Sequence, residues 1–130
     1  MDVFEHIPPS EIPRALCDIE SLLKVNGTLT LRVPNGLSPF GRFNQHGDDT
    51  HTAVVTPAKI RQWALKTNLQ LQDVRNEARV PAGKSAVRRC LKRIQFLVRD
   101  CLNQALAAIY GLPTSALDPN LIIVLKRVAV

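Results

Sequence analysis

Polar and apolar residues alternate along two stretches of the chain, which predicts two strands. Thr28–Val33 alternates after the turn-forming Gly27, and Pro34 ends it because proline has no backbone N–H to donate. Leu69–Val74 alternates in the same way. The last stretch, Leu121–Val130, is instead dense in β-branched residues, which is typical of a strand covered on both faces.

Helical spacing marks two further segments. The first follows Ser10, a favourable N-cap, and ends at Asn26–Gly27, residue types that tolerate the left-handed conformation found after helices. The second begins at Thr56–Pro57 and ends at Asn68. We expect one buried stripe on each: Ile12, Ala15, Leu16, Ile19, Leu22 and Leu23 on the first, and Ile60, Trp63, Ala64 and Thr67 on the second.

A long helical pattern fills most of the insertion between the last two strands, roughly residues 77–119. The helix is expected over Lys84–Tyr110, which makes the insertion much longer than a hairpin loop. Its apolar side consists of Val87, Leu91, Ile94, Val98, Cys101, Ala105 and Ile109, and its basic residues are Arg88, Arg89, Lys92, Arg93 and Arg99.

Three interpretations of this basic helix stay open. It packs on the domain and leaves a cationic face in solvent, or residues 84–110 lie on an anionic membrane surface, or it binds RNA. We do not expect a nucleic acid partner, because Phe96 and Tyr110 are the helix's only aromatic residues and a base-stacking platform needs more.

Composition narrows the class of protein. The chain has 130 residues, 45% hydrophobic and 22% charged, which suits one domain, and its net charge of +6 favours an acidic partner. Three cysteines without a CxxC pair favour a reducing, cytoplasmic setting. Because the start carries Asp2 and Glu5 and apolar runs such as Leu121–Leu125 are short, we expect no signal peptide and no membrane span, but at most peripheral association with the inner membrane face.

Candidate chemistry gathers in two places. Ligands of open α/β sheets bind beyond the carboxyl ends of strands, which draws attention to the polar loop from Asn35 to Thr56. At the other place, Met1–Ile7 has strand-like residues and begins abruptly, so we expect it to be the end of a longer unit.

The order of elements, with Asp2-Val3-Phe4-Glu5-His6-Ile7 in front and Val-Pro-Asn after the first strand, resembles the C-terminal half of a class I S-adenosylmethionine-dependent methyltransferase. Gly36-Leu37-Ser38-Pro39-Phe40, Gly47-Asp48-Asp49-Thr50-His51 and Thr56-Pro57 resemble the enzymes of surface-polysaccharide and related small-molecule biosynthesis. The resemblance implies an α/β fold: a partial Rossmann-like sheet made of strands four (its end) to seven, with the last strand antiparallel between the two before it, and a long helical insertion. Residues 1–130 would form one partial domain.

The chain departs from this family at the cofactor. Members hold S-adenosylmethionine on a Gly-rich turn after their first strand, but the six glycines here include no Gly-x-Gly pair. We therefore expect a portion that lacks the cofactor-binding half and is inactive alone. Without its fourth-strand neighbour, the strand from Thr28 would leave an open edge, which predicts a homo-oligomer or pairing with the missing N-terminal half.

The resemblance also suggests site residues. Glu5 and His6 fall where the family's fourth strand meets the cofactor, and we expect His6 and His51 as general bases because histidine titrates near neutrality. The acceptor would be bound by Asn35, His46, Asp48 and His51. A divalent metal on Asp2, Glu5 and His6, as in similar ubiquinone-pathway methyltransferases, or on His46 and His51, is a weaker alternative, and we expect no metal ion.

The sequence thus predicts the C-terminal portion of a methyltransferase that acts on a small-molecule, glycan or lipid-linked acceptor. The alternative is a non-catalytic interaction module that binds membrane or a protein partner through its basic helix. Neither the methyl acceptor nor the methylated atom follows from the sequence.

Overall fold

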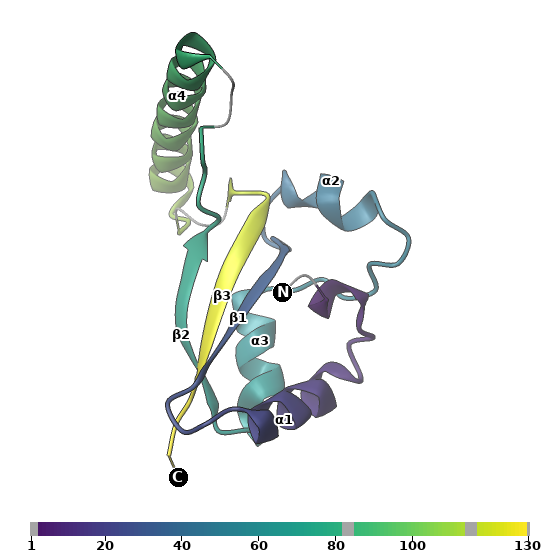
Figure 1. The fold of residues 1–130 in the computed structure, drawn as a ribbon. Coiled ribbons are helices and arrows are strands. Elements are labelled where there is room, and N and C mark those ends of the chain that lie inside the picture. The colour runs from purple at the N-terminus through teal and green to yellow at the C-terminus, as the bar shows by residue number, and fades with distance from the viewer. Residues whose placement is uncertain (1–2, 82–84, 114–116, 130) are drawn as a thin grey trace.

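The last strand lies at the centre of a three-stranded antiparallel sheet. The computed structural model describes residues 3–81, 85–113 and 117–129. The strands are β1 (Thr28–Pro34), β2 (Leu69–Asn76) and β3 (Asn120–Arg127), and the helices are α1 (Ile12–Leu22), α2 (Gly41–His46), α3 (Pro57–Trp63) and α4 (Ala86–Tyr110), with the 3₁₀ turns η1 (Phe4–His6) and η2 (Ala64–Lys66). The strand order is β1-β3-β2 (Figure 1).

Both outer strands pair with β3 in the antiparallel sense, so β1 and β2 run parallel to each other. Thr28 faces Lys126 and Pro34 faces Asn120 in the first ladder. The second ladder has a bulge between Leu71 and Asp73. The predicted position of an antiparallel last strand between its two predecessors is therefore confirmed, and the predicted long helix between the last two strands is confirmed with it.

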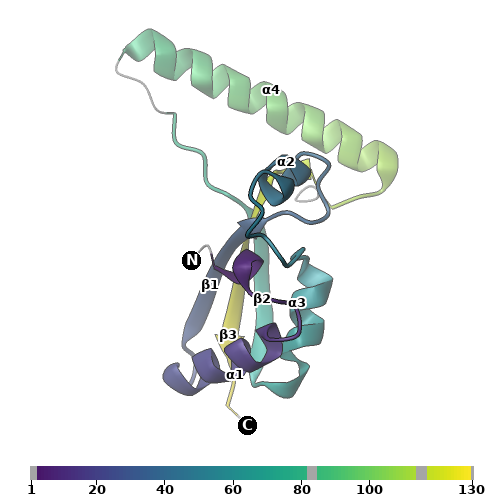
Figure 2. The ribbon, with the colours of Figure 1, turned by 90° about the vertical axis from the view of Figure 1, so that its right-hand side faces the viewer.

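Helices cover one face of the sheet only (Figure 2). Leu121, Ile123 and Leu125 of β3 are buried there, while Ile122 and Val124 on the opposite face are half-exposed. The core also takes in Phe4, Ile12, Leu16, Leu29, Leu31, Val33, Ala53, Val55, Ile60, Ala64 and Leu69. The prediction that β3 is covered on both faces is wrong: β-branched residues occupy both sides of the strand, but α1 and α3 lie on only one of them.

The ends of the two short helices follow the sequence in part. Thr56 caps α3, since its Oγ1 accepts a hydrogen bond from the Lys59 N–H at 3.2 Å, and Asn26 adopts the left-handed conformation after α1 with φ of 65°. Ser10, by contrast, does not cap α1, which starts at Ile12 after Glu11 without a side-chain cap. Leu22 was expected in the buried stripe and is 84% exposed, because at about 100° per residue it lies well to one side of the line through Ile12 and Leu16.

Two local predictions were wrong in the same way. At both places the structure has helical residues where the sequence predicted a strand end or a loop. Phe4–His6 forms the turn η1 instead of the end of a strand, and Phe4 fills the core from there. Met1 and Asp2 lie outside the described residues. The loop after β1 contains the six-residue helix α2, which begins at a glycine because a Cβ there would collide with the Asn35 carbonyl oxygen.

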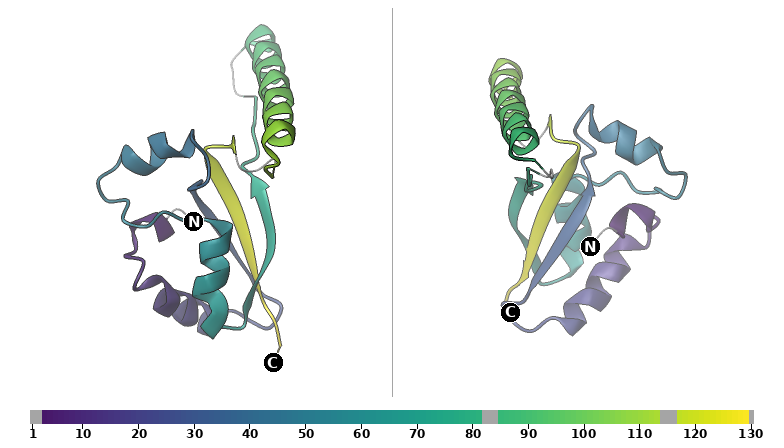
Figure 3. Two further views of the ribbon diagram at one scale, coloured as in Figure 1. Left: turned by 180° about the vertical axis from the view of Figure 1, so that it is seen from behind. Right: turned by 45° about the horizontal axis from the view of Figure 1, so that its top comes forward.

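The long helix α4 lies beyond the end of the sheet at which β1 and β2 finish (Figures 1 and 3). Ser85 caps it, since its Oγ accepts from the Arg88 N–H, and Gly111 ends it in the left-handed conformation. The predicted start at Lys84 lies outside the described residues. No helix within the described ranges, α4 included, combines the length and the apolar character needed to cross a bilayer.

Candidate functional site

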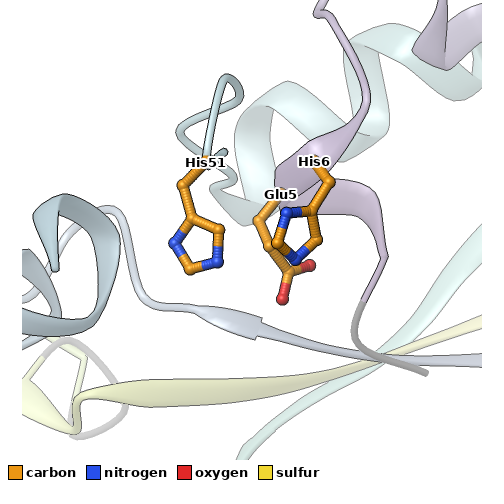
Figure 4. Close-up of side chains that lie close together, drawn as sticks. All are labelled: Glu5, His6 and His51. Atoms are coloured by element: carbon orange, nitrogen blue, oxygen red, sulfur yellow. The ribbon is translucent and has the colours of Figure 1, made fainter. Parts of the chain in front are cut away.

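The turn η1 and the loop after α2 meet beside the carboxyl end of β1. The backbone N–H groups of Thr52 and Ala53 both donate to the Glu5 carbonyl oxygen, at 2.8 and 3.0 Å. These bonds join segments more than forty residues apart in the sequence. They bring His51, the residue before them, next to Glu5 and His6 (Figure 4).

Glu5, His6 and His51 form one cluster. The two imidazole rings meet edge to face with their centroids 4.6 Å apart. Glu5 is only 4% exposed, and its Oε2 has no hydrogen-bond partner among the described residues. A buried carboxylate oxygen without a partner is costly, so a donor or cation that reached this atom would be favoured.

Hydrogen bonds assign the tautomer of both histidines. His51 Nδ1 lies 3.0 Å from the Asn44 carbonyl oxygen, which can only accept, so Nδ1 carries the proton. Thr50 Oγ1 donates its proton to Asp48 Oδ1 at 2.6 Å and therefore accepts from His6 Nδ1 at 2.8 Å. In the neutral form, Nε2 of each ring is then left with a lone pair that can take a proton or bind a cation.

Asp48 fixes this arrangement from the solvent side. Its Oδ1 accepts from the Thr50 hydroxyl and, at 2.9 Å, from the Thr50 N–H. These two bonds lower the pKa of Asp48, the hydroxyl contributing more than the N–H, so the carboxylate is charged at neutral pH. Its Oδ2 lies 3.8 Å from His51 Nε2. Asp48 thus orients His6 through Thr50 and lies close enough to stabilise a protonated His51.

A cavity of about 230 Å³ opens at this cluster, lined by Glu5, Arg32, Val33, Pro34, Asn44, His51 and Asn120. It lies at the carboxyl end of β1, where a ligand of an open α/β sheet is expected. A larger cavity of about 470 Å³ lies under α4, lined by Asn76, Glu77, Arg79, Phe96, Asp100, Asn103 and Gln104. The smaller of these two cavities is the better candidate site, because its lining includes Glu5 and His51 of the cluster.

The other predicted acceptor ligands lie differently. Asn35 is 1% exposed, and its side chain links backbone: Nδ2 donates to the Asp118 carbonyl at 2.8 Å and Oδ1 accepts from the Leu37 N–H at 3.0 Å. His46 is exposed at the end of α2 and does not join the Glu5 cluster. Acceptor binding by Asn35 and His46 stays a prediction, and the geometry gathers Glu5, His6, Asp48 and His51 instead.

Sequence reasoning missed a second polar group at the same end of the sheet. Arg32 Nε donates to Glu77 Oε1 at 2.7 Å, and Asn120 Nδ2 donates to Glu77 Oε2 at 3.0 Å. The bond from Asn120 contributes most to a lowered pKa of Glu77, and the bond from Arg32 adds to it. The one sequence signal that could have indicated this group is a charged residue, Arg32, within an otherwise uncharged strand. This group ties the ends of all three strands beside the cavity.

The cluster also has the donor set of a divalent cation site. Glu5, His6 and His51 each offer one ligand atom, and these atoms lie within 4.8 Å of one another. Zinc bonds of about 2.0–2.2 Å require ligand atoms about 3.5 Å apart, so the side chains would have to close by about 1 Å. The sequence had offered Glu5 and His6 with Asp2 as one metal alternative and His51 with His46 as another. The structure combines members of the two, and Asp2 lies outside the described residues.

Comparisons of the chain with protein-family models, with curated proteins and with solved structures found no match.

Proposed function

We propose that the chain is the C-terminal portion of an S-adenosylmethionine-dependent methyltransferase that acts on a small-molecule, glycan or lipid-linked acceptor. The observation that carries the proposal is the strand arrangement together with the place of the cluster. An antiparallel last strand lies between two parallel strands, and Glu5, His6 and His51 meet at the carboxyl end of the first of these. The resemblance implies the strand arrangement, and it also implies that Glu5 and His6 lie near the cofactor.

In methyl transfer the protein mainly has to position the acceptor against the methyl donor and to remove a proton from the acceptor. An acceptor oxygen or nitrogen attacks the sulfonium methyl carbon in line, the carbon–sulfur bond breaks, and S-adenosylhomocysteine leaves. In this proposal His51 Nε2 takes the acceptor proton, because its Nδ1 already donates to Asn44 and Asp48 stands 3.8 Å away to stabilise the imidazolium. Glu5 and His6 contact the bound cofactor or acceptor, and the unpartnered Glu5 Oε2 supplies an acceptor of hydrogen bonds.

In this proposal, tight binding of S-adenosylmethionine depends on a part of the fold outside residues 1–130. None of the six glycines forms the Gly-x-Gly turn that the family uses against the cofactor. Calorimetric titration of S-adenosylmethionine tests this. A chain extended upstream by its own reading frame is expected to bind it one to one, and residues 1–130 alone to release little or no heat. An extended chain that binds no cofactor would overturn the proposal, and so would equal affinity in both chains.

The role of His51 as the general base is tested in the extended chain by measuring the rate at which S-adenosylhomocysteine is released. His51→Asn keeps an N–H donor toward the Asn44 carbonyl but removes Nε2, whereas His51→Ala removes both. Both variants are expected to lose about 10²–10⁴-fold in turnover and to keep cofactor affinity. Normal turnover in His51→Asn would remove the assigned role. Repeating the assay with a chelator separates proton transfer from a cation at Glu5, His6 and His51, because only a cation role is lost on chelation.

A second candidate function, an interaction module without catalysis, is favoured by one observation. The apolar side of α4 is exposed instead of packed on the domain. A separate translation start at Met1, together with no cofactor binding by any extended chain, would select this alternative.

A further inference from the structure

The apolar side of α4 faces away from the rest of the molecule. Residues at helical spacing along it are mostly exposed: Val87 by 69%, Leu91 by 60%, Ile94 by 52%, Val98 by 54%, Leu102 by 58% and Ile109 by 74%. We call these six residues the outer stripe. This reverses the first interpretation of the helix, in which the apolar side packs on the domain. An apolar strip this long on a surface usually marks an interaction site.

The opposite side of α4 is fixed to the body by polar contacts. Asp118 is 2% exposed and accepts from Arg79 at 2.6 and 2.7 Å, from Arg99 at 2.9 Å and from Asn103 at 3.4 Å. Arg79 also pairs with Asp100. At about 100° per residue, Arg99, Asp100 and Asn103 lie across the helix from the outer stripe. The outward orientation of the stripe is therefore set by a buried ionic group.

Basic residues make the polar side of α4 cationic in its N-terminal half, with Arg88 next to the stripe and Arg89, Lys92 and Arg93 across the helix from it. Arg88, Arg89, Lys92, Arg93 and Arg99 all lie within the stretch from Ala86 to Arg99, which contains no Asp or Glu. The first four of these side chains are exposed. Tyr110, an amphipathic residue typical of the membrane interface, is 70% exposed at the other end.

We propose that α4 docks on an anionic phospholipid surface, with the outer stripe in the headgroup and acyl boundary and the exposed cations Arg88, Arg89, Lys92 and Arg93 attracted to the lipid phosphates. A helix with one apolar side, a cationic remainder and too little apolar character to span the bilayer fits this place. Charge complementarity favours lipid over a second copy, because each copy carries +6 and a copy-to-copy contact brings like charges together.

Docking would also orient the candidate site. α4 lies beyond the end of the sheet where β1 and β2 finish (Figure 1). The cavity lined by Glu5 and His51 is at the same end, because Pro34 and Asn120 also line it. Membrane-bound α4 would thus hold this end toward the lipid surface. The inference does not depend on methyl transfer, because vesicle binding and cofactor binding are measured separately.

Vesicle flotation of residues 1–130 tests the proposal. The chain is expected to float with vesicles of phosphatidylcholine mixed with phosphatidylglycerol, and to stay at the bottom with phosphatidylcholine alone. High salt is expected to weaken binding, because it screens the phosphates. Removing two cations with Arg88→Gln and Arg93→Gln is expected to reduce partitioning about 25-fold, since each basic residue contributes about fivefold near such a surface.

The stripe is tested with a matched pair of variants. Ile94→Glu and Gln95→Glu add the same charge at neighbouring exposed positions, but only Ile94 belongs to the outer stripe. Ile94→Glu is expected to abolish flotation, and Gln95→Glu to weaken it about fivefold. The proposal is overturned if the anionic vesicles bind no protein, if Ile94→Glu floats like the original chain, or if sedimentation shows a dimer that Ile94→Glu dissociates.

Discussion

The sequence identified which residues of the candidate site carry chemistry, but it did not show which of them contact one another. Glu5, His6 and His51 stood out in the sequence because their side chains carry proton and cation chemistry. Their contact depends on the Thr52 and Ala53 N–H groups that bind the Glu5 carbonyl, and no local pattern reveals bonds across more than forty residues. The unpartnered Glu5 Oε2 likewise follows from burial, which a lone carboxylate in a sequence does not show.

The acid dependence of stability is expected to include Glu77. Its pKa is lowered in the folded chain by Asn120 and Arg32, so its charged form stabilises the fold above the unfolded value near 4.5, and this contribution is lost as the pH falls through the lower folded pKa. Glu77→Gln is expected to cost about 1 kcal/mol or less at pH 7, because the pair with Arg32 is 41% exposed on both sides, and less at pH 3 than at pH 7. Urea unfolding of both proteins at pH 7 and at pH 3 measures this change in the free energy of unfolding.

The control for Glu77, which follows β2, is Asp73→Asn within that strand. The Asp73 side chain has a comparable exposure, and its carboxylate pairs with Arg75 at 3.6 Å. Its substitution is expected to leave the free energy of unfolding nearly unchanged. An equal loss in Glu77→Gln at pH 7 and pH 3 would show that the carboxylate charge contributes nothing.

At the scale of elements, periodicity was informative where one face of an element is buried. The strands β1 and β2 and the helix α3 begin within one or two residues of their predicted starts, because alternation and the Thr56–Pro57 signal act locally. The helix α2 was missed because Gly41–His46 is short and mostly polar. The pattern of α4 identified its apolar side but not its direction, which Asp118 determines from outside the helix.

The central strand allows a direct comparison of the two sheet faces. Ile123 is fully buried under α1 and α3, whereas its neighbour Ile122 is half-exposed on the opposite face. Ile123→Ala is expected to cost about 2–5 kcal/mol and Ile122→Ala about 1 kcal/mol in urea unfolding. Equal losses in residues 1–130 would mean that the second face is also covered. In an extended methyltransferase chain the cost of Ile122→Ala is expected to rise, because further helices would bury that face.

At the scale of the whole molecule, four surfaces are left without a partner within the described ranges: the outer stripe of α4, the second sheet face and the outer edges of β1 and β2. β1 pairs with β3 alone, so its other edge presents backbone donors and acceptors. In the proposed fold this edge belongs beside the fourth strand. An open edge of seven residues is a template for another chain, and we therefore expect association through β1.

Sedimentation at rising concentration is expected to show residues 1–130 passing from monomer to a larger species in the high micromolar range. Thr30→Lys places a charge on the exposed face of β1 and is expected to weaken association, since edge lysines oppose strand pairing. Gln70→Lys puts the same charge on β2 and should have no effect if β1 is the edge that pairs. A sharp monomer at every concentration would contradict the prediction, whereas dissociation by Ile94→Glu instead of Thr30→Lys would move the contact to the outer stripe.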